Sequence, residues 1–255
     1  MVSIIEVKNV GITFGAHKAV DDVTFSVKEN EFTSIIGPNG AGKTTLFNLL
    51  SGQLSVSTGN IYFQGTNITK LSTMERTRLG IGRSFQITNV FPNLTVLENV
   101  RLAVQSEQKV RYSMFRSIYA FKQFEEMAMI LLELTLLQNK ELTLAKNLSH
   151  GDKRKLELAM LLALKPKVLL LDEPTAGMSI EDVPMIYEVI QKIKDEGDKT
   201  ILLIEHKMDM IINLSERVMV LFNGVLLADG TPKEIMENET VQTAYLGGLY
   251  DGHSA

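Results

Sequence analysis

The chain has 255 residues, a length typical of one large domain or of one domain with a sizeable insertion. Apolar residues make up 45% and charged residues 22%, as in an ordinary globular protein, and the formal net charge of −4 gives no electrostatic reason to expect nucleic acid as a partner. The absence of cysteine excludes disulfides, thiolate–zinc sites and a cysteine nucleophile. Because no run of about 18 apolar residues is present, we expect no membrane-spanning helix.

The first part of the chain predicts strands and one helix. Apolar and polar side chains alternate in several short segments, and a buried segment runs directly into a glycine-rich stretch. Residues 43–52 predict a helix, with Gly52 as its C-terminal stop. The strands predicted in this part lie at residues 3–14, 19–27, 31–37 and 59–68.

The middle of the chain has a different pattern. Residues from about 95 to 147 have helical periodicity and few helix breakers, whereas strands alternate with helices again from residue 167 onward. The later segments predict strands near 168–171, 200–206 and 217–230, and a helix at 181–197. This order predicts an α/β fold, with residues 1–255 as a single domain and a helical subdomain inserted at about 95–160.

A phosphate-binding pattern occupies residues 37–44, where GPNGAGKT matches G-x-x-x-x-G-K-[ST] in full. Glycines allow successive backbone N–H groups to face phosphate oxygens, and the following helix directs its positive end at the same anion. Lys43 can reach the β- and γ-phosphates, and the Thr44 hydroxyl can hold Mg²⁺. A chance glycine-rich turn is the alternative, but a strand before the motif and a helix after it argue against it. The nucleotide-binding residues predicted here are Gly37, Pro38, Asn39, Gly40, Ala41, Gly42, Lys43, Thr44 and Thr45.

Two carboxylates end the apolar segment KVLLLDEP at residues 167–174. Asp172 is predicted to hold Mg²⁺ through water, and Glu173 to orient or deprotonate the attacking water. On its own the pattern fits two acids that merely cap a loop after a core strand. Its combination with the phosphate loop favours the catalytic interpretation.

Three further segments extend the pattern beyond a generic nucleotide binder: LSHGDKRKLELAMLLALKP before the two carboxylates, Gln86 in GRSFQ, and His206 in LLIEH. With them, the chain resembles an ATP-binding cassette (ABC) ATPase over nearly its whole length. The resemblance implies a P-loop NTPase fold with a RecA-like core, an antiparallel β subdomain and an inserted α-helical subdomain. It also implies ATP and Mg²⁺ as the bound nucleotide and metal.

The resemblance implies that two cassettes face head to tail, with each ATP between the phosphate loop of one and the signature of the other. The family signature L-S-G-G-Q corresponds to Leu148–Asp152, in which Ser149 and Gly151 match. His150 and Asp152 depart from it. A carboxylate at position 152 would repel a triphosphate unless Lys153 and Arg154 offset it or the side chain points away. Asp152→Gln is therefore expected to tighten the ATP-bound dimer.

Four more residues receive roles from the resemblance. Gln86 corresponds to the glutamine that contacts Mg²⁺ and the attacking water, and His206 to the histidine that contacts the γ-phosphate. Phe14 corresponds to the aromatic residue that stacks on adenine, and Val20 adds apolar contact to the base. The alternatives are a surface glutamine, a structural histidine and a core phenylalanine.

Two segments narrow the resemblance within the family. Residues 82–100 and the ending VQTAYLGG resemble ATPase subunits of branched-chain amino acid importers, while LSHG and EPTAGMS are similar to the urea and short-amide branch. Such a subunit pairs with a second copy or a paralogue and works beneath two membrane-spanning permease chains. It lies peripherally on the cytoplasmic face of the cell membrane and depends indirectly on an external solute-binding protein.

Other functions remain open from the sequence. A soluble ABC protein acting on ribosomes or nucleic acid would usually carry two cassettes or long coiled coils, and this chain has neither. An exporter ATPase would have the same hydrolytic residues. A GTP-binding switch would need N-K-x-D, whereas residues 139–142 read NKEL.

Overall fold

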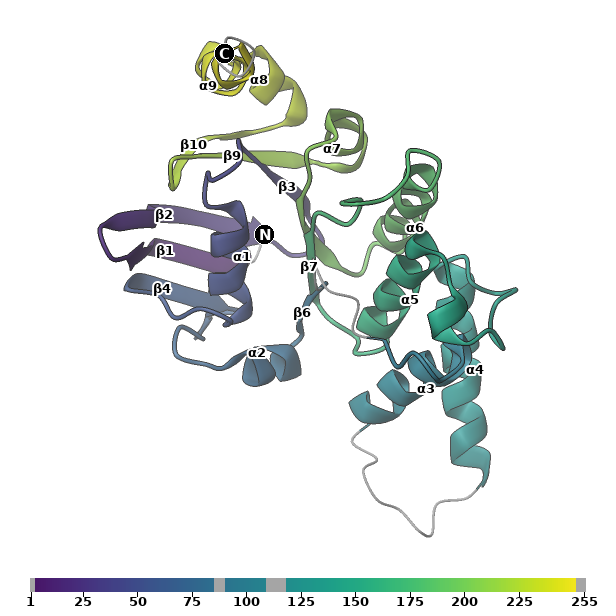
Figure 1. Cartoon of the computed structure of the whole chain (residues 1–255). Coiled ribbons are helices and arrows are strands. Elements are labelled where there is room, and N and C mark those ends of the chain that lie inside the picture. The colour runs from purple at the N-terminus through teal and green to yellow at the C-terminus, as the bar shows by residue number, and fades with distance from the viewer. Residues whose placement is uncertain (1–2, 85–89, 109–117, 251–255) are drawn as a thin grey trace. The chain divides into compact units, whose positions relative to one another are not determined.

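The computed structural model describes the backbone of residues 3–84, 90–108 and 118–250, and the side chains of all of these except 118–121 and 245–250. The chain forms two compact units (Figure 1). We call them the sheet unit and the helical unit. The sheet unit comprises residues 1–81, 168–173 and 198–255, and the helical unit comprises residues 82–167 and 174–197. The predicted insertion at 95–160 falls inside the helical unit.

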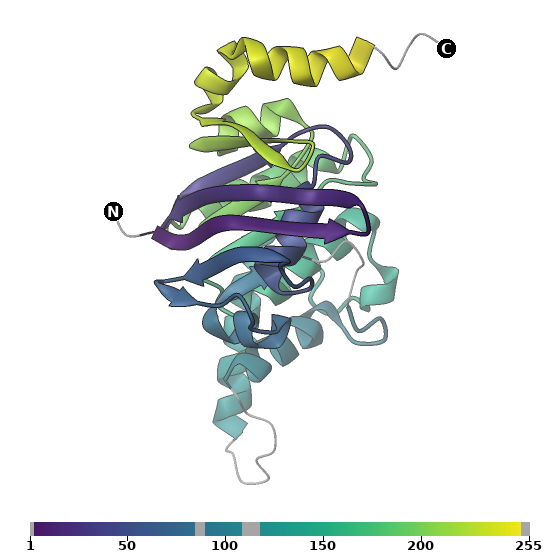
Figure 2. The same cartoon turned by 90° about the vertical axis from the view of Figure 1, so that its left-hand side faces the viewer.

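The sheet unit contains an antiparallel sheet of four strands in the order β2-β1-β4-β5, with the long β1 and β2 side by side (Figure 2). Its alternating sequence places apolar side chains such as Val7, Val23 and Ile61 in the core, while polar neighbours face outward. The strands are β1 (Ser3–Phe14), β2 (His17–Lys28), β4 (Thr58–Phe63) and β5 (Thr66–Asn67).

The second sheet has six strands in the order β10-β9-β3-β8-β7-β6. They are β3 (Phe32–Ile36), β6 (Ile81–Arg83), β7 (Val168–Asp172), β8 (Thr200–Ile204), β9 (Arg217–Phe222) and β10 (Val225–Gly230). The strands β3, β8 and β7 are parallel neighbours, and their continuous burial explains their uninterrupted apolar sequences. The segments that follow these three strands therefore leave the sheet at the same edge.

The sheet unit contains the helix predicted at residues 43–52 and four further helices that were not predicted from the sequence. The predicted stop at Gly52 is confirmed, because this residue has φ 77° and its N–H donates to the last carbonyls of α1. The short α2 and α8 each begin with a capping box, formed by Ser72 with Glu75 and by Thr231 with Glu234. The helices are α1 (Lys43–Ser51), α2 (Thr73–Leu79), α7 (Met208–Leu214), α8 (Pro232–Glu237) and α9 (Glu239–Tyr250).

The helical unit packs its helices around a separate core that includes Val100, Leu132 and Leu156. Its helices are α3 (Val96–Glu107), α4 (Ile118–Leu134), α5 (His150–Leu162) and α6 (Val183–Asp195), with a short 3-10 turn, η1 (Ala145–Asn147). The predicted helical run to residue 147 is too long, because Leu136 has φ 58° and turns follow it. No helix within the described residues is long and apolar enough to cross a membrane.

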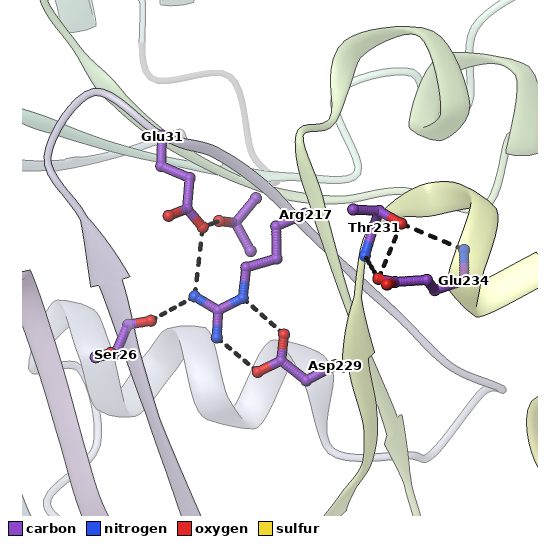
Figure 3. Close-up of polar contacts among 7 residues, drawn as sticks. Ser26, Glu31, Arg217, Asp229, Thr231 and Glu234 are labelled. Atoms are coloured by element: carbon purple, nitrogen blue, oxygen red, sulfur yellow. Dashed lines mark hydrogen bonds and ion pairs between the residues drawn. The ribbon is translucent and has the colours of Figure 1, made fainter.

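Arg217 joins three segments of the sheet unit at the start of β9 (Figure 3). Its Nε and one terminal nitrogen donate to the two carboxylate oxygens of Asp229, at 2.6 and 2.5 Å. The other terminal nitrogen donates to the carbonyl of Ser26 at 2.6 Å and to Oε1 of Glu31 at 3.3 Å. The hydrogen bonds that Arg217 donates to Asp229 are the main cause of its raised pKa, although burial opposes them.

Arg217→Met should lower the free energy of unfolding by about 2–3 kcal/mol, because it leaves Glu31 buried without this cation and breaks the bidentate pair with Asp229. Urea unfolding at neutral pH measures the difference. Arg78→Met, at an exposed arginine of α2, is the matched control and should change little. Equal stability of the two variants would contradict the expected role of Arg217.

Candidate functional site

A pocket of about 400 Å³ lies in the sheet unit, around the glycine-rich loop that follows β3. Its volume falls in the range of sites that hold small organic ligands. The pocket combines an ammonium group, hydroxyl groups, backbone amides, a carboxylate and an aromatic ring. Its lining residues are Phe14, His17, Ala19, Asn39, Gly40, Ala41, Gly42, Lys43, Thr44, Thr45 and Glu173.

The loop geometry requires glycine and leaves a helix start facing the pocket. Gly42 has φ 100°, and a Cβ at this position would lie 2.4 Å from the carbonyl oxygen of Ala19. Gly42 is also the N-cap of α1, so no side chain caps the helix, and the first turn holds no acidic residue. The unpaired N–H groups at this helix start favour an anion in the pocket.

Lys43 brings a buried positive charge to the same loop. Its Nζ donates to the carbonyls of Gly37 and Pro38 at 2.8 and 3.0 Å. Burial lowers the pKa of Lys43, while the negative charges of Glu173 and Asp172 act in the opposite direction. Burial removes water that would otherwise stabilise the charged ammonium group. A bound anion would stabilise that charge instead.

The two predicted carboxylates lie where β7 ends. Asp172 is the last residue of the strand, fully buried and in register with Ile204 of β8. Glu173 has φ 45°, which is strained for a residue with a side chain, and its N–H donates to the Ile204 carbonyl at 2.9 Å. This turn of the backbone puts the Glu173 side chain in the pocket wall.

His206 lies close to Glu173, because β8 is the neighbour of β7. Its Nε2 is 3.0 Å from Oε1 of Glu173, and both side chains are partly exposed. The structure therefore brings Lys43, Glu173 and His206 to one edge of the sheet. An acid and an imidazole in hydrogen-bond contact beside a phosphate-type cradle can position and deprotonate a water molecule.

The remaining predicted residues of the sheet unit have different positions. Phe14 ends β1, is 49% exposed and lines the pocket, so its ring is not part of the core. Val20 is 1% exposed and packs in the core, whereas His17 and Ala19 line the pocket. Strand alternation puts residues 17 and 19 on one face and residue 20 on the other, so the sequence contained the signal for His17 and Ala19. Gln86 lies outside the described residues.

The signature residues begin α5 in the helical unit. Ser149 is the N-cap, and its Oγ accepts a hydrogen bond from the N–H of Asp152 at 3.1 Å. Ser149 and His150 are exposed. Gly151 is buried, and a Cβ there would lie 3.2 Å from Cγ of Asp182, so a larger residue would require the Asp182 side chain to shift.

Asp152 has other partners than the sequence suggested. Its carboxylate is 5% exposed and pairs with Lys155 at 2.7 Å and with Lys140. Arg154 instead pairs with Glu157 at 2.8 Å. The charge of Asp152 is therefore offset by Lys155 and Lys140, and not by the adjacent Lys153 and Arg154.

Asp152 should make the free energy of unfolding depend on pH in the acidic range. Burial acts to raise the pKa of Asp152, but hydrogen bonds from Lys140, Lys155 and Ser149 together lower it below the ordinary value of 3.8. Its stabilising contribution is therefore fully present above the unfolded-state pKa and is lost as pH falls through the lower folded-state pKa. In urea unfolding at pH 7, 5 and 3, Asp152→Asn should have a lower free energy of unfolding than the wild type, and this difference should be smallest at pH 3. A difference that is the same at all three pH values would contradict this contribution.

Comparison with known proteins gives two family matches. The model of the ABC transporter family matches residues 20–176, which include the pocket loop, the signature turn and both carboxylates. A second model, described as branched-chain amino acid ATP-binding cassette transporter, matches residues 225–251. This second match covers β10, α8 and α9.

Individual relatives agree with these matches over nearly the full length. The high-affinity branched-chain amino acid transport ATP-binding protein LivG of Salmonella typhimurium is 36% identical over 252 residues, covering 96% of this chain and 98% of LivG. A crystal structure of an ABC transporter cassette in its ADP conformation superimposes with a TM-score of 0.82 at 30% identity, covering 97% of this chain and 100% of the other. A dimeric bacterial ABC transporter cassette gives a TM-score of 0.75 at 27% identity, covering 89% of this chain and 98% of the other.

Proposed function

Because the chain belongs to the ATP-binding cassette transporter family, we propose that it is the ATP-hydrolysing subunit of a membrane importer for branched-chain amino acids or related small amide solutes. The 3.0 Å contact between Glu173 and His206 at the end of two parallel strands supports the hydrolytic part of the proposal, and the family match at residues 225–251 supports the transport part. Glu173 itself lines the pocket that contains the phosphate-type loop and Lys43.

The pocket suits a nucleoside triphosphate in shape and charge. The loop from Gly37 to Thr45 offers backbone N–H groups and the Lys43 ammonium to phosphate oxygens. Phe14 is the exposed aromatic ring of the pocket and would stack on the base. We assign Val20 a supporting role behind this face rather than a direct contact, since it is buried.

A magnesium ion would be held by the Thr44 hydroxyl and, through water, by the Asp172 carboxylate, with Gln86 as a further ligand. Both oxygen types suit Mg²⁺, which usually completes its shell with water and substrate phosphates. Across residues 3–84, 90–108 and 118–250, no group of three or more His, Cys, Asp or Glu side chains could hold a metal by itself. A magnesium ion held jointly with the phosphates would neutralise charge that develops during hydrolysis.

In the hydrolytic step, Glu173 would accept a proton from the attacking water, and His206 would hold that carboxylate in place and contact the γ-phosphate. The charge on the phosphates is met by Lys43 and the α1 start. The strained backbone at Glu173 fixes the carboxylate before substrate arrives.

Two copies, or one copy and a paralogue, would enclose each nucleotide, with Ser149 and Gly151 of one facing the phosphates held by the other. The exposed N-cap at Ser149 is suited to this contact. The closing and opening of this dimer would drive two membrane-spanning permease chains from the cytoplasmic face, with solute delivered by an external binding protein. Support for a dimer comes from the similarity to a dimeric cassette.

Reconstituted transport tests the proposed function. The subunit with its permease chains and binding protein, in liposomes, should import labelled leucine when MgATP is on the cassette side, and Lys43→Met should abolish uptake because it removes the phosphate cation. The match at residues 225–251 favours leucine over urea or acetamide. Efflux instead of uptake, or uptake that survives Lys43→Met, would contradict the proposal.

A further inference from the structure

We define residues 148–152 as the signature turn. A charge cluster of Asp152, Lys155 and Lys140 involves the last residue of this turn. Asp152 is in the first turn of α5, where a negative charge also suits the helix dipole. One of its carboxylate oxygens lies 2.7 Å from Nζ of the buried Lys155, and the other pairs with Nζ of Lys140. The charge of Asp152 is therefore compensated inside the helical unit.

The two lysines attach Asp152 to different parts of that unit. Lys155 also donates to the carbonyl of Leu136 at 3.3 Å, and Leu136 lies in the turn directly after α4. Lys140 belongs to the turns that follow α4, and its side chain is 46% exposed. Asp152 thus connects the start of α5 to the end of α4 and to the segment after it.

Asp152 is also bonded to the exposed part of the signature turn. Its N–H donates to Oγ of Ser149 at 3.1 Å, so the Ser149 rotamer and the first turn of α5 are fixed together. The Ser149 and His150 side chains remain exposed. The same short turn therefore contains the buried Asp152 carboxylate, which pairs with two lysines, and the exposed Ser149 side chain.

We propose that Asp152 is a positioning residue, which holds the Ser149 turn in the orientation that meets the ATP bound by the partner copy; this inference rests on the proposed function. A glutamine at position 152 carries no charge and cannot form ion pairs with Lys140 and Lys155. Asp152→Gln is therefore expected to weaken the ATP-bound dimer, which is the opposite of what repulsion alone predicts.

Lys140→Met tests the inference without altering the signature turn or the buried Lys155. In a Glu173→Gln background with MgATP, it should raise the dimer dissociation constant about fivefold to twentyfold in analytical ultracentrifugation. Lys140→Arg keeps the ion pair and should restore dimerisation. Lys146→Met is the matched control, because Lys146 is also exposed and follows α4 but contacts Asn93 rather than Asp152.

Two further measurements separate positioning from general damage. ATP binding by the monomeric Lys140→Met chain should be unchanged, because the pocket residues belong to the sheet unit. Equal dimerisation of Lys140→Met and Lys146→Met would overturn the inference, as would a failure of Lys140→Arg to rescue. If Ser149→Ala weakens dimerisation and Lys140→Met does not, only the inference fails. If Ser149→Ala also leaves dimerisation unchanged, the result contradicts the proposed dimer itself, in which Ser149 contacts the partner's ATP.

Discussion

Glu173→Gln should reduce the rate of ATP hydrolysis at least about 100-fold and leave ATP binding within twofold of the wild-type affinity. The amide keeps the size of the side chain and its place in the pocket wall, but it cannot accept a proton from water. Its loss of charge also removes one negative group near Lys43, which favours retention of the phosphates. Phosphate release and fluorescent-nucleotide binding measure the two quantities.

The control for this prediction is Glu181→Gln, which neutralises an exposed carboxylate outside the pocket. It should hydrolyse ATP at the wild-type rate. His206→Gln should also lower hydrolysis, because Glu173 loses the imidazole partner at 3.0 Å. A Glu173→Gln protein that hydrolyses ATP as fast as the wild type would show that another group activates the water.

Arg76→Met should lower the free energy of unfolding by about 3–5 kcal/mol, the largest stability effect that we expect from a single substitution outside the pocket. Arg76 is 1% exposed, and burial lowers its pKa to about 10, so it remains charged at neutral pH. Its guanidinium group donates to carbonyls of α1 and of the segment before α2. The four acceptors, at 2.6 to 3.0 Å, are the carbonyls of Leu49, Leu50, Thr69 and Leu71.

Two of these acceptors lie at the C-terminal end of α1, where helix carbonyls have no partner within the helix. Methionine would leave them buried without these donors. Urea unfolding measures the loss, with Arg78→Met on the same helix as the exposed control. Because Arg76→Met can fall below the threshold for folding, Arg76→Lys provides a measurable intermediate with a charge and fewer donors. Equal unfolding curves for Arg76→Lys and the wild type would contradict the role of the guanidinium group.

Local patterns in the sequence predicted most of the strands and the pocket loop, but not the short β6. The glycines of the loop and the apolar run before Asp172 are patterns within short segments, and parallel strands bring their ends to one edge of the sheet. The role of His206 came from the family resemblance. Phe14 lines the same pocket, and its stacking on adenine stays a prediction from the family resemblance. The strand alternation alone would have directed attention to Ala19 instead of Val20.

Contacts between segments distant in the sequence were not predictable in the same way. The pairing of Asp152 with Lys140 depends on how the turns after α4 fold back, and no periodic pattern encodes this. Adjacent basic residues were therefore the natural expectation for its partners. Arg76 likewise follows a helical pattern in which an arginine is usually exposed, and only the packing of α2 against the end of α1 buries it.

We propose that each triphosphate lies between the pocket loop of one copy and the signature turn of another. Because the chain has no cysteine, single cysteines can test this contact directly. One Glu173→Gln preparation carries Asn39→Cys in the loop, a second carries His150→Cys in the turn, and the two are mixed in equal amounts. Both positions are exposed.

A short thiol crosslinker should join the two variants into a covalent dimer with MgATP and not without it. A crosslink in a mixture of single-cysteine chains can form only between molecules, so it reports the contact between loop and turn. Omission of nucleotide, and each variant alone, are the controls. Equal yields with and without MgATP, or efficient linkage only between two Asn39→Cys chains, would contradict the claim.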